Sequence, residues 1–347
     1  MSRTNDTNLT SRPEDLASIH RVLVTRLRWL GDVVMSTPML EVLRERLPHA
    51  TIEYMTYPFF APALQGHPGC DRVLTLPSKA GPRATLAITK QLRTPRIDWF
   101  FDTLGNPRSS FLMSLARPRH SVAPYRGFRS RLYEHTQHHE HGERSAVRHQ
   151  LDMLTPLLGW VDERPPKVFV EESERQEIAE RLDIEVGGDI VVVHPGATKP
   201  ERAWPIERWP ALIAELKRER PDVRVLVVTQ PGWEDAARQI VEASNAGVRQ
   251  LPALDLRSLM ALVSLASLYV GNDGGILHTA VALRVPTVGI FGPTEDDVWF
   301  PYARWGPFRV VVASAGPFRA RQTVPARPDA AVGEVVAAIE EVLSGQT

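Results

Sequence analysis

Two neighbouring stretches decide the fold of this chain: Leu268-Tyr-Val-Gly-Asn-Asp-Gly-Gly-Ile-Leu-His278 and Thr287-Val-Gly-Ile-Phe-Gly-Pro-Thr294. The apolar run 268–270 predicts a strand, and the glycine-rich turn after it leads into a helix expected near Ile276. A second strand, 287–291, ends in another turn. A helix start offers free N–H groups and a positive dipole end. We therefore expect an anion site at the carboxyl edge of a parallel sheet, with Asp273 and His278 beside it.

Working outward, strands and helices alternate along the whole chain, which predicts α/β units with parallel sheets. The predicted strands are 21–26, 51–55, 73–76, 99–101, 190–193, 223–229, 268–270 and 287–291. The predicted helices are 39–46, 146–158, 173–182, 206–219, 235–243, 256–266 (with Asp255 as its N-cap) and 331–343. The Arg- and His-rich segment 125–149 has no clear assignment before its helix begins. Paired prolines at 165 and 166 mark a linker, so we predict domains at 21–164 and 165–330.

The composition is that of an ordinary soluble globular protein, and 347 residues suggest two domains. No apolar run reaches about 18 residues, which excludes a membrane span. Residues 1–20 are polar and lack the apolar core of a signal peptide, so we expect a disordered leader. The single cysteine, Cys70, excludes an internal disulfide and argues for a reducing compartment. A cytoplasmic enzyme is the expectation.

Positive charge is concentrated in one part of this electrically neutral chain. Only Asp98 and Asp102 oppose the basic residues at positions 72, 79, 83, 90, 93, 96, 108, 117, 119, 126, 129 and 131. A basic face indicates an anionic partner, such as an anionic lipid, a phosphorylated glycan or a nucleic acid. The alternative, an arginine-rich surface in contact only with water, stays open; nothing else supports nucleic-acid binding.

Asp32 lies just past Gly31, after the first predicted strand and at the carboxyl edge of its sheet. A carboxylate there can act as a general base if a cleft shields it. The competing interpretation is a helix N-cap, a common position for Asp.

The first loop of the second half reads His194-Pro-Gly-Ala-Thr198, followed by Lys199 and Arg202. Backbone amides, a threonine hydroxyl and one cation at a helix entrance suit a diphosphate. An ordinary turn between a strand and a helix, with an arginine in solvent, is the alternative.

Histidines at 135, 138, 139, 141 and 149 invite a metal interpretation, but their spacing matches no zinc signature and no cysteine accompanies them. We predict neither a metal nor a cofactor. The Walker A, GxSxG and GxGxxG patterns are absent, which argues against a kinase, a serine hydrolase and a simple dehydrogenase.

In combination, three blocks resemble glycosyltransferase family 9, the ADP-heptose:lipopolysaccharide heptosyltransferases. The blocks are Arg26-Leu-Arg-Trp-Leu-Gly-Asp-Val-Val-Met-Ser-Thr-Pro38, His194-Pro-Gly-Ala-Thr198 with Arg202-Ala-Trp-Pro205, and Gly271-Asn-Asp-Gly-Gly-Ile-Leu-His278 through Phe291-Gly-Pro-Thr294. The resemblance covers roughly residues 20–310. It implies a GT-B fold, in which two Rossmann-like domains face each other across a cleft, and an inverting transfer without a metal. By the same resemblance, the helix in 331–347 would pack back toward the N-terminal domain.

The resemblance also implies roles for individual residues. Asp32 matches the proposed catalytic base, and Asp273 matches an acidic residue near the donor. The donor phosphates would meet Thr198, Arg202, Gly274, Gly275 and His278. The sequence departs from many relatives at Gly274, where serine is common, and at Arg202, where lysine is common. These departures put the donor's base and sugar in doubt, but not the reaction class.

On this interpretation the basic stretch binds an anionic glycolipid acceptor and contacts the cytoplasmic face of the inner membrane. The expected acceptor residues are Arg28, Arg117, Arg119, Arg126 and Arg129, with Arg131 on the same face. The predicted function is heptosyl transfer from a nucleoside-diphosphate sugar, ADP-heptose in the first place, to a lipopolysaccharide-core acceptor. A nucleotide-sugar 2-epimerase of GT-B fold and a non-catalytic glycan- or nucleotide-binding relative are the alternatives.

Overall fold

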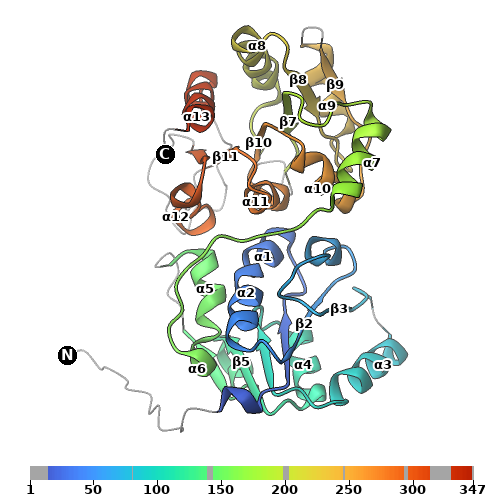
Figure 1. The fold of residues 1–347 in the computed structure, drawn as a ribbon, viewed down its shortest axis with the longest axis vertical. Helices are drawn as coiled ribbons and strands as arrows, with labels where there is room; N and C mark the ends of the chain where they lie inside the picture. The colour runs from blue at the N-terminus through green and yellow to red at the C-terminus, as the bar shows by residue number, and fades with distance from the viewer. Residues whose placement is uncertain are drawn as a thin grey trace, which may run out of the picture.

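The computed structural model describes residues 15–79, 81–138, 144–197, 203–244, 247–292, 296–312 and 330–345, and it contains two α/β units stacked end to end (Figure 1). Residues 15–20 were expected in the disordered leader, but they are ordered. A 3-10 helix spans Leu16–Ser18 with Asp15 as its N-cap, and Ile19 is fully buried. The remainder of that leader lies outside the described residues.

The first unit contains a parallel sheet of six strands in the order β3-β2-β1-β4-β5-β6. The strands are β1 (Arg21–Thr25), β2 (Thr51–Thr56), β3 (Arg72–Thr75), β4 (Trp99–Asp102), β5 (His120–Pro124) and β6 (His135–Gln137). The helices are α1 (Leu30–Met35), α2 (Thr37–Arg46), α3 (Pro82–Arg93), α4 (Pro107–Ala116), α5 (Ala146–Asp152) and α6 (Thr155–Leu158), with 3-10 helices η2 (Ala61–Leu64) and η3 (Gly127–Leu132). Strand order reverses between β1 and β4.

The second unit repeats this design, with the order β12-β11-β10-β7-β8-β9. Its strands are β7 (Ile190–His194), β8 (Arg224–Val227), β9 (Val248–Gln250), β10 (Leu268–Asn272), β11 (Thr287–Phe291) and β12 (Phe308–Val312). Its helices are α7 (Glu172–Leu182), α8 (Trp209–Glu219), α9 (Glu234–Glu242), α10 (Leu256–Ser264), α11 (Gly275–Ala282), α12 (Asp296–Trp299) and α13 (Val332–Ser344), with η5 (Ile206–Arg208) and η6 (Ala303–Trp305). Here the order reverses between β7 and β10, and such reversal points are where ligands bind in open α/β sheets.

Most predicted elements are present, and the differences have local causes. The helix predicted over 146–158 is two helices, α5 and α6, and Pro156 lies in the first turn of the second. Proline cannot donate to a preceding turn, so it is tolerated only near a helix start. Asp255 is the predicted N-cap: its side chain accepts a 3.0 Å hydrogen bond from the Ser258 amide.

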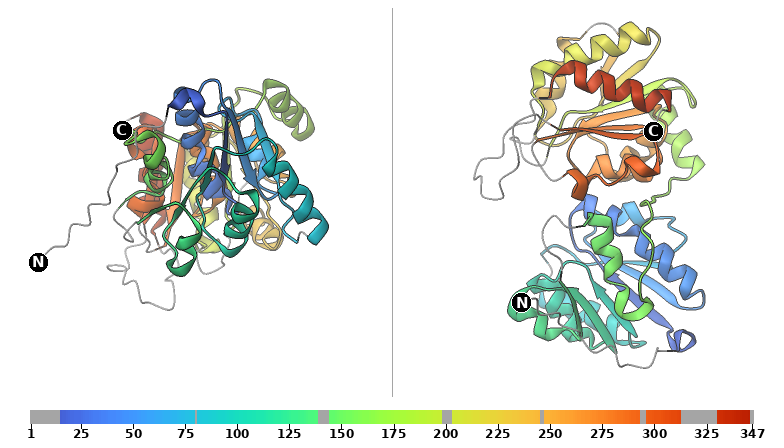
Figure 2. Two further views of the ribbon diagram at one scale, coloured as in Figure 1. Left: turned by 90° about the horizontal axis from the view of Figure 1, so that it is seen from below. Right: turned by 90° about the vertical axis from the view of Figure 1, so that its left-hand side faces the viewer.

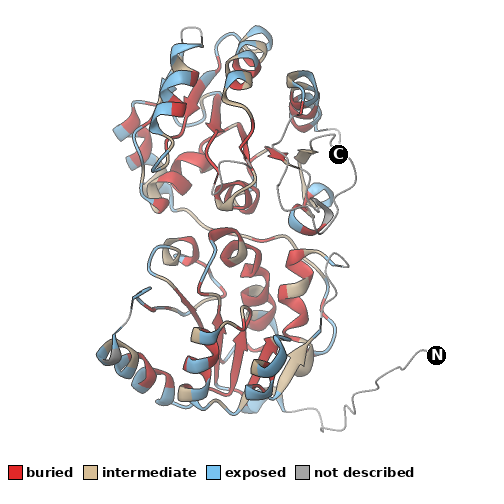
Figure 3. Ribbon diagram, turned by 180° about the vertical axis from the view of Figure 1, so that it is seen from behind, coloured by how far each residue is buried: buried red, intermediate tan, exposed pale blue. Residues whose placement is uncertain are grey.

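Helices cover both faces of each sheet, and the strands carry the buried residues (Figure 3). One hydrophobic core runs through both units, because it combines buried side chains of α1 and α2 with those of α10 and α11. Two further cores lie against the remaining sheet faces, one under α3 and α4 and the other under α8 and α13. The contact between the units is therefore a packed apolar interface around α1 and α11.

The segment between α6 and α7 carries the chain from one unit to the other (Figure 1). The Lys167 amide donates to Thr37 Oγ1 of α2 at 3.0 Å, and the Val168 amide donates to the Ala282 carbonyl of α11 at 3.3 Å. The predicted boundary between residues 164 and 165 falls in this crossing segment.

The C-terminal helix α13 packs on the second unit, against β11, β12 and α8 (Figure 2). Just before it, the Ala330 carbonyl accepts hydrogen bonds from Trp204 Nε1 at 2.9 Å and Arg208 Nη1 at 2.6 Å. The expectation that this helix returns to the N-terminal domain is wrong, because its apolar face completes the core of the second sheet. Among the described residues, no helix has the length and apolar character that crossing a bilayer requires.

Candidate active site

The starts of α1 and α11 meet at the boundary between the two units. A Cβ on Gly31 would lie 2.6 Å from His278 Cδ2, and a Cβ on Gly275 would lie 2.7 Å from Leu30 Cβ. Both approaches are closer than a side chain permits, so each helix needs a glycine to admit the other. The contact brings the loop after β1 against the turn after β10, and each of these loops follows the strand beside its sheet's reversal point.

Asp32 is in the first turn of α1 with a largely buried side chain, 13 % exposed. Its Oδ1 forms an ion pair with Arg26 Nη2 at 2.8 Å. Arg26 also donates to the Arg28 carbonyl at 2.9 Å and to the Thr103 carbonyl at 2.7 Å. The guanidinium thus fixes the carboxylate and joins the loops that follow β1 and β4. Asp32 is not the N-cap, which is Trp29, but it takes part in capping α1 from the third position, since its Oδ2 accepts a 3.4 Å hydrogen bond from the Trp29 amide.

Asp273 and Gly274 form the turn between β10 and α11, and Gly275 begins the helix. The Asp273 amide donates to the Ile290 carbonyl of β11 at 3.2 Å, which holds the turn against the neighbouring strand. The start of α11 then lies against the first unit, where Gly275 meets Leu30 of α1.

Asp32 and Asp273 both influence the pKa values of His278 and Tyr302. Burial lowers the pKa of His278 below 6.5, while Asp273 and Asp32 act in the opposite direction. Burial also raises the pKa of Tyr302 well above 10, and both aspartates add to that shift. The carboxylates from the two units thus converge on one buried pair of rings.

His278 itself is 4 % exposed, and its Nδ1 lies 2.9 Å from the Tyr302 hydroxyl. A buried ring with a lowered pKa is neutral near pH 7, so it supplies no full positive charge to a diphosphate. The structure therefore places His278 in the contact between the units. Its predicted role in phosphate binding remains a prediction.

The loop after β7 lies beside the turn after β10. Asn272 is fully buried and joins the two: its Nδ2 donates to the Pro195 carbonyl at 2.6 Å, and its Oδ1 accepts from the Trp204 amide at 3.0 Å. Of the predicted phosphate-binding residues in this loop, Thr198 and Arg202 lie outside the described residues.

His194, the last residue of β7, was quoted in the motif but was not predicted as a site residue. Its Nδ1 lies 3.0 Å from the Tyr269 hydroxyl and its Nε2 lies 3.1 Å from Gln230 Oε1. Burial lowers its pKa to about 4. His194 and Asn272 share a signal that could have identified them: each is a polar residue at the carboxyl end of a fully buried strand.

The predicted acceptor arginines do not form one face. Arg117 and Arg119 precede β5, at the amino edge of the first sheet, where Arg119 Nε pairs with Asp98 Oδ1 at 3.2 Å. Arg126 and Arg129 follow β5, at the carboxyl edge, and Arg129 Nε donates to the Gly105 carbonyl at 3.4 Å. Grouping all of them on one acceptor face is wrong, because a strand separates the two sets. Arg28 shares the carboxyl edge, in the loop between β1 and α1.

A pocket of about 570 Å³ lies between the two units, beside the contact between α1 and α11. Its lining comes from the start of α5, the crossing segment and the chain between α12 and β12: Arg144, Ser145, Arg148, Trp160, Glu163, Phe300, Pro301, Ala303 and Arg304. Arg304 Nη2 pairs with Glu163 there at 2.7 Å, and Arg148 Cζ lies 4.2 Å from the Trp160 ring centre. Neither Asp32 nor Asp273 lines this pocket. Within the described residues, neither belongs to a cluster of three side chains that could share a metal ion.

Two Rossmann-like units with their reversal points at a shared boundary define a fold of the GT-B type. Residues 85–312 match glycosyltransferase family 9 (heptosyltransferase), and the chain belongs to this family. It is an enzyme of the glycosyltransferase class.

Known relatives agree with this assignment. Lipopolysaccharide heptosyltransferase 1 of Escherichia coli K12 is 23 % identical over 299 residues, covering 82 % of this chain and 91 % of the relative. A family 9 glycosyltransferase structure from Veillonella parvula has a TM-score of 0.81 at 20 % identity, covering 95 % of this chain and 99 % of that one. The structure of E. coli ADP-heptose lps heptosyltransferase II has a TM-score of 0.78 at 20 % identity, covering 94 % and 99 %.

A UDP-GlcNAc 2-epimerase from Methanocaldococcus jannaschii also shares the fold. Its TM-score is 0.53 at 12 % identity, covering 94 % of this chain and 93 % of the epimerase. At this identity the likeness concerns the fold alone, so the family match, not the architecture, separates the transferase from the epimerase alternative.

Proposed function

We propose that this chain transfers a heptose from ADP-heptose to an acceptor of the lipopolysaccharide-core type, with inversion at the anomeric carbon and without a metal ion. The donor and the acceptor class come from the names of the relatives. The observation that carries the proposal is the convergence of Asp32, from the first unit, with the Asp273 turn and the start of α11, from the second.

In this mechanism Asp32 is the general base. It takes the proton from an acceptor hydroxyl while that oxygen bonds to the anomeric carbon, and the bond from that carbon to the diphosphate oxygen breaks. Attack from the face opposite the leaving group inverts the centre, through a transition state of oxocarbenium character. The ion pair with Arg26 holds the carboxylate in place for this step.

The departing nucleoside diphosphate gains negative charge as the bond breaks. The amides of Gly274 and Gly275 at the start of α11 are placed to stabilise that charge, because a helix start combines free N–H groups with a positive dipole end. By resemblance, Thr198 and Arg202 would share this task, and Asp273 would hold hydroxyls of the sugar or the ribose.

The acceptor and the membrane would meet the first unit at η3, beside the carboxyl edge of its sheet. Phe128 is 78 % exposed, and Arg131 Cζ lies 5.2 Å from its ring centre. Tyr125 and Leu132 are about half exposed on either side, and Arg126 and Arg129 lie between them in the sequence. Exposed aromatic and aliphatic groups between arginines suit the interface of an anionic membrane.

The Asp32→Asn variant tests the proposed function. The amide keeps the shape of the carboxylate but cannot take the proton, so kcat should fall by about 10²-fold or more. Because the donor site is built from the second unit, ADP and ADP-heptose should still raise the unfolding temperature of the variant as they do for the wild type.

Three outcomes would contradict this function. Full turnover in Asp32→Asn would remove Asp32 from the mechanism. A change of configuration at C2 of the sugar in the absence of an acceptor would identify an epimerase. A wild-type protein that binds ADP-heptose but gives no turnover with any core acceptor would identify a binding protein.

A further inference from the structure

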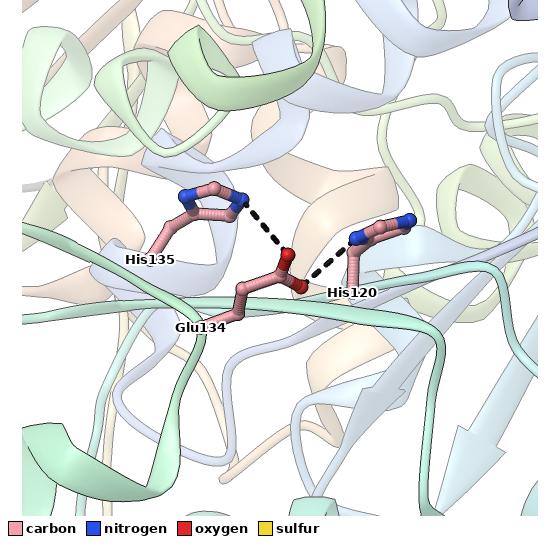
Figure 4. A group of neighbouring side chains, drawn as sticks. All are labelled: His120, Glu134 and His135. Carbon is pink, nitrogen blue, oxygen red and sulfur yellow. Dashed lines mark hydrogen bonds and ion pairs between the residues drawn. The ribbon is translucent and has the colours of Figure 1, made fainter. Parts of the chain in front are cut away.

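Three side chains with metal-ligand chemistry meet at one end of the first sheet, away from the candidate active site. They are His120 at the start of β5, His135 at the start of β6, and Glu134 just before β6 (Figure 4). Strands β5 and β6 are parallel: His120 begins β5 and His135 begins β6 opposite Val122, whereas Asp32 follows the carboxyl end of β1. The function proposed above gives these residues no role.

Glu134 lies between the two imidazoles. His120 Nδ1 is 2.8 Å from Glu134 Oε2, and His135 Nε2 is 3.7 Å from Glu134 Oε1 (Figure 4). One ligand atom from each residue lies within 4.8 Å of the others. Two donors on a tetrahedral zinc ion are about 3.3 Å apart, given bonds of about 2.0–2.1 Å. Small side-chain rotations would therefore bring all three atoms to one ion.

The surrounding residues hold the two imidazoles and the backbone of Glu134 before any ion binds. Both imidazoles stack on Trp99, with ring centres 4.6 Å away for His120 and 5.8 Å away for His135. The Glu134 amide donates to Ser121 Oγ at 3.2 Å, which holds the backbone of Glu134 against β5. Ligands held in this way lose little conformational freedom on binding, which favours affinity.

We propose that His120, Glu134 and His135 form a binding site for a divalent transition-metal ion, with zinc as the ion that suits it best. Two imidazoles and one carboxylate select such ions over Mg²⁺ and Ca²⁺, which take oxygen ligands. The fourth position of a tetrahedral zinc ion would hold water. The ion would tie β6, a three-residue edge strand, to β5 and would take no part in glycosyl transfer.

The test uses the full chain without a histidine tag, stripped of metal by dialysis against a chelator. Zn²⁺ is titrated by calorimetry, and Co²⁺ is added as a spectroscopic probe of the ligand set. We expect one zinc ion per chain, a cobalt absorption typical of nitrogen and oxygen ligands, and an unfolding temperature that rises with Zn²⁺ concentration. His120→Gln and His135→Gln should each weaken binding at least tenfold, since loss of a supporting group alone costs about 10–100-fold.

His138→Gln is the matched control. His138 stacks on Tyr125 with ring centres 4.2 Å apart and does not belong to the group, so its loss should leave zinc binding unchanged. Zinc binding that survives in the double variant His120→Gln/His135→Gln would come from other histidines and would overturn the proposal. Absence of stoichiometric binding in the wild type would also overturn it, leaving a hydrogen-bonded cluster.

Discussion

The surroundings of His194 decide its protonation state. It ends a fully buried strand, and hydrogen bonds to Tyr269 and Gln230 occupy both of its ring nitrogens. Gln230 Nε2 also donates to the Ala197 carbonyl at 3.3 Å, which orients the Gln230 oxygen toward His194. The sequence alone predicted a phosphate-binding loop here. The burial that makes His194 neutral comes from β8 and β10 on either side, which the local pattern does not contain.

Because His194 is neutral in the folded protein, we predict that it lowers the free energy of unfolding in acid. Burial lowers the pKa of His194 to about 4, so the unfolded chain takes up the proton first as the pH falls below 6.5. The free energy of unfolding should fall between pH 6.5 and pH 4, by up to about 1.4 kcal/mol per pH unit for this one group. Urea unfolding at several pH values should show a shallower pH dependence in His194→Gln.

Part of the pH dependence should remain in that variant, because burial also lowers the pKa of His67 to about 4. Equal pH dependence in His194→Gln and the wild type would mean that His194 titrates normally in the folded protein.

At the scale of elements, the central strands and most helices of the second unit were predictable, whereas the edge strands β6, β9 and β12 and several helices of the first unit were not. The strands β1, β2, β7 and β11 match their predictions closely because their buried residues form apolar runs. The strands β5, β6, β9 and β12 were missed; β5, β6 and β9 are strands because of their pairing with neighbours rather than their own composition, whereas β12 is an apolar run that could have been predicted. The helices α1, α3 and α4 were also missed, although α3 and α4 have twelve and ten residues.

The α1–α11 contact depends on two glycines, and this predicts their sensitivity to substitution. Alanine normally favours a helix over glycine, but in Gly31→Ala the new Cβ would meet His278 Cδ2 at 2.6 Å. Overpacking of this kind costs about 1–3 kcal/mol, so the unfolding free energy should fall and transfer activity should fall with it. Chemical denaturation and initial-rate measurements would check both effects.

Gly333→Ala is the control for this prediction. Gly333 lies in α13, and a Cβ there meets nothing within 4 Å, so the change should be neutral or stabilising. If Gly31→Ala matched this control in stability and rate, the close approach of α1 to α11 would not exist in solution.

At the scale of the whole molecule, the two-unit architecture was predicted from the ordered motifs, whereas the single basic face predicted from the charge count is divided in the structure. Arg117 and Arg131 lie close in sequence, but β5 stands between them. A five-residue strand spans about 17 Å, so neighbours along the chain reach opposite edges of the sheet. Charge counting along a sequence cannot detect that separation.

Because the two sets of arginines lie at opposite edges of the sheet, one set can serve as a control for the other in a test of the acceptor proposal. Combined replacement of Arg126, Arg129 and Arg131 by alanine should raise the acceptor KM, leave the donor KM unchanged and weaken binding to anionic vesicles. The vesicle effect should be on the order of 100-fold, from about 1 kcal/mol per arginine near the membrane surface. Vesicle sedimentation and steady-state kinetics measure the two effects.

The paired variant Arg117→Ala/Arg119→Ala, at the opposite edge, should behave as the wild type in both assays. An equal loss from the two sets, or an effect on the donor KM, would show that the arginines act through net charge and not through a face at η3.

The position of α13 has a consequence for how such a protein can change over generations. Because this helix stays with the second sheet, the described chain crosses between the units once, between α6 and α7. Each unit is thus encoded by one continuous piece of gene. A single recombination event in the codons of the crossing segment can join the first unit of one transferase to the second unit of another, provided that the glycines at the α1–α11 contact are kept.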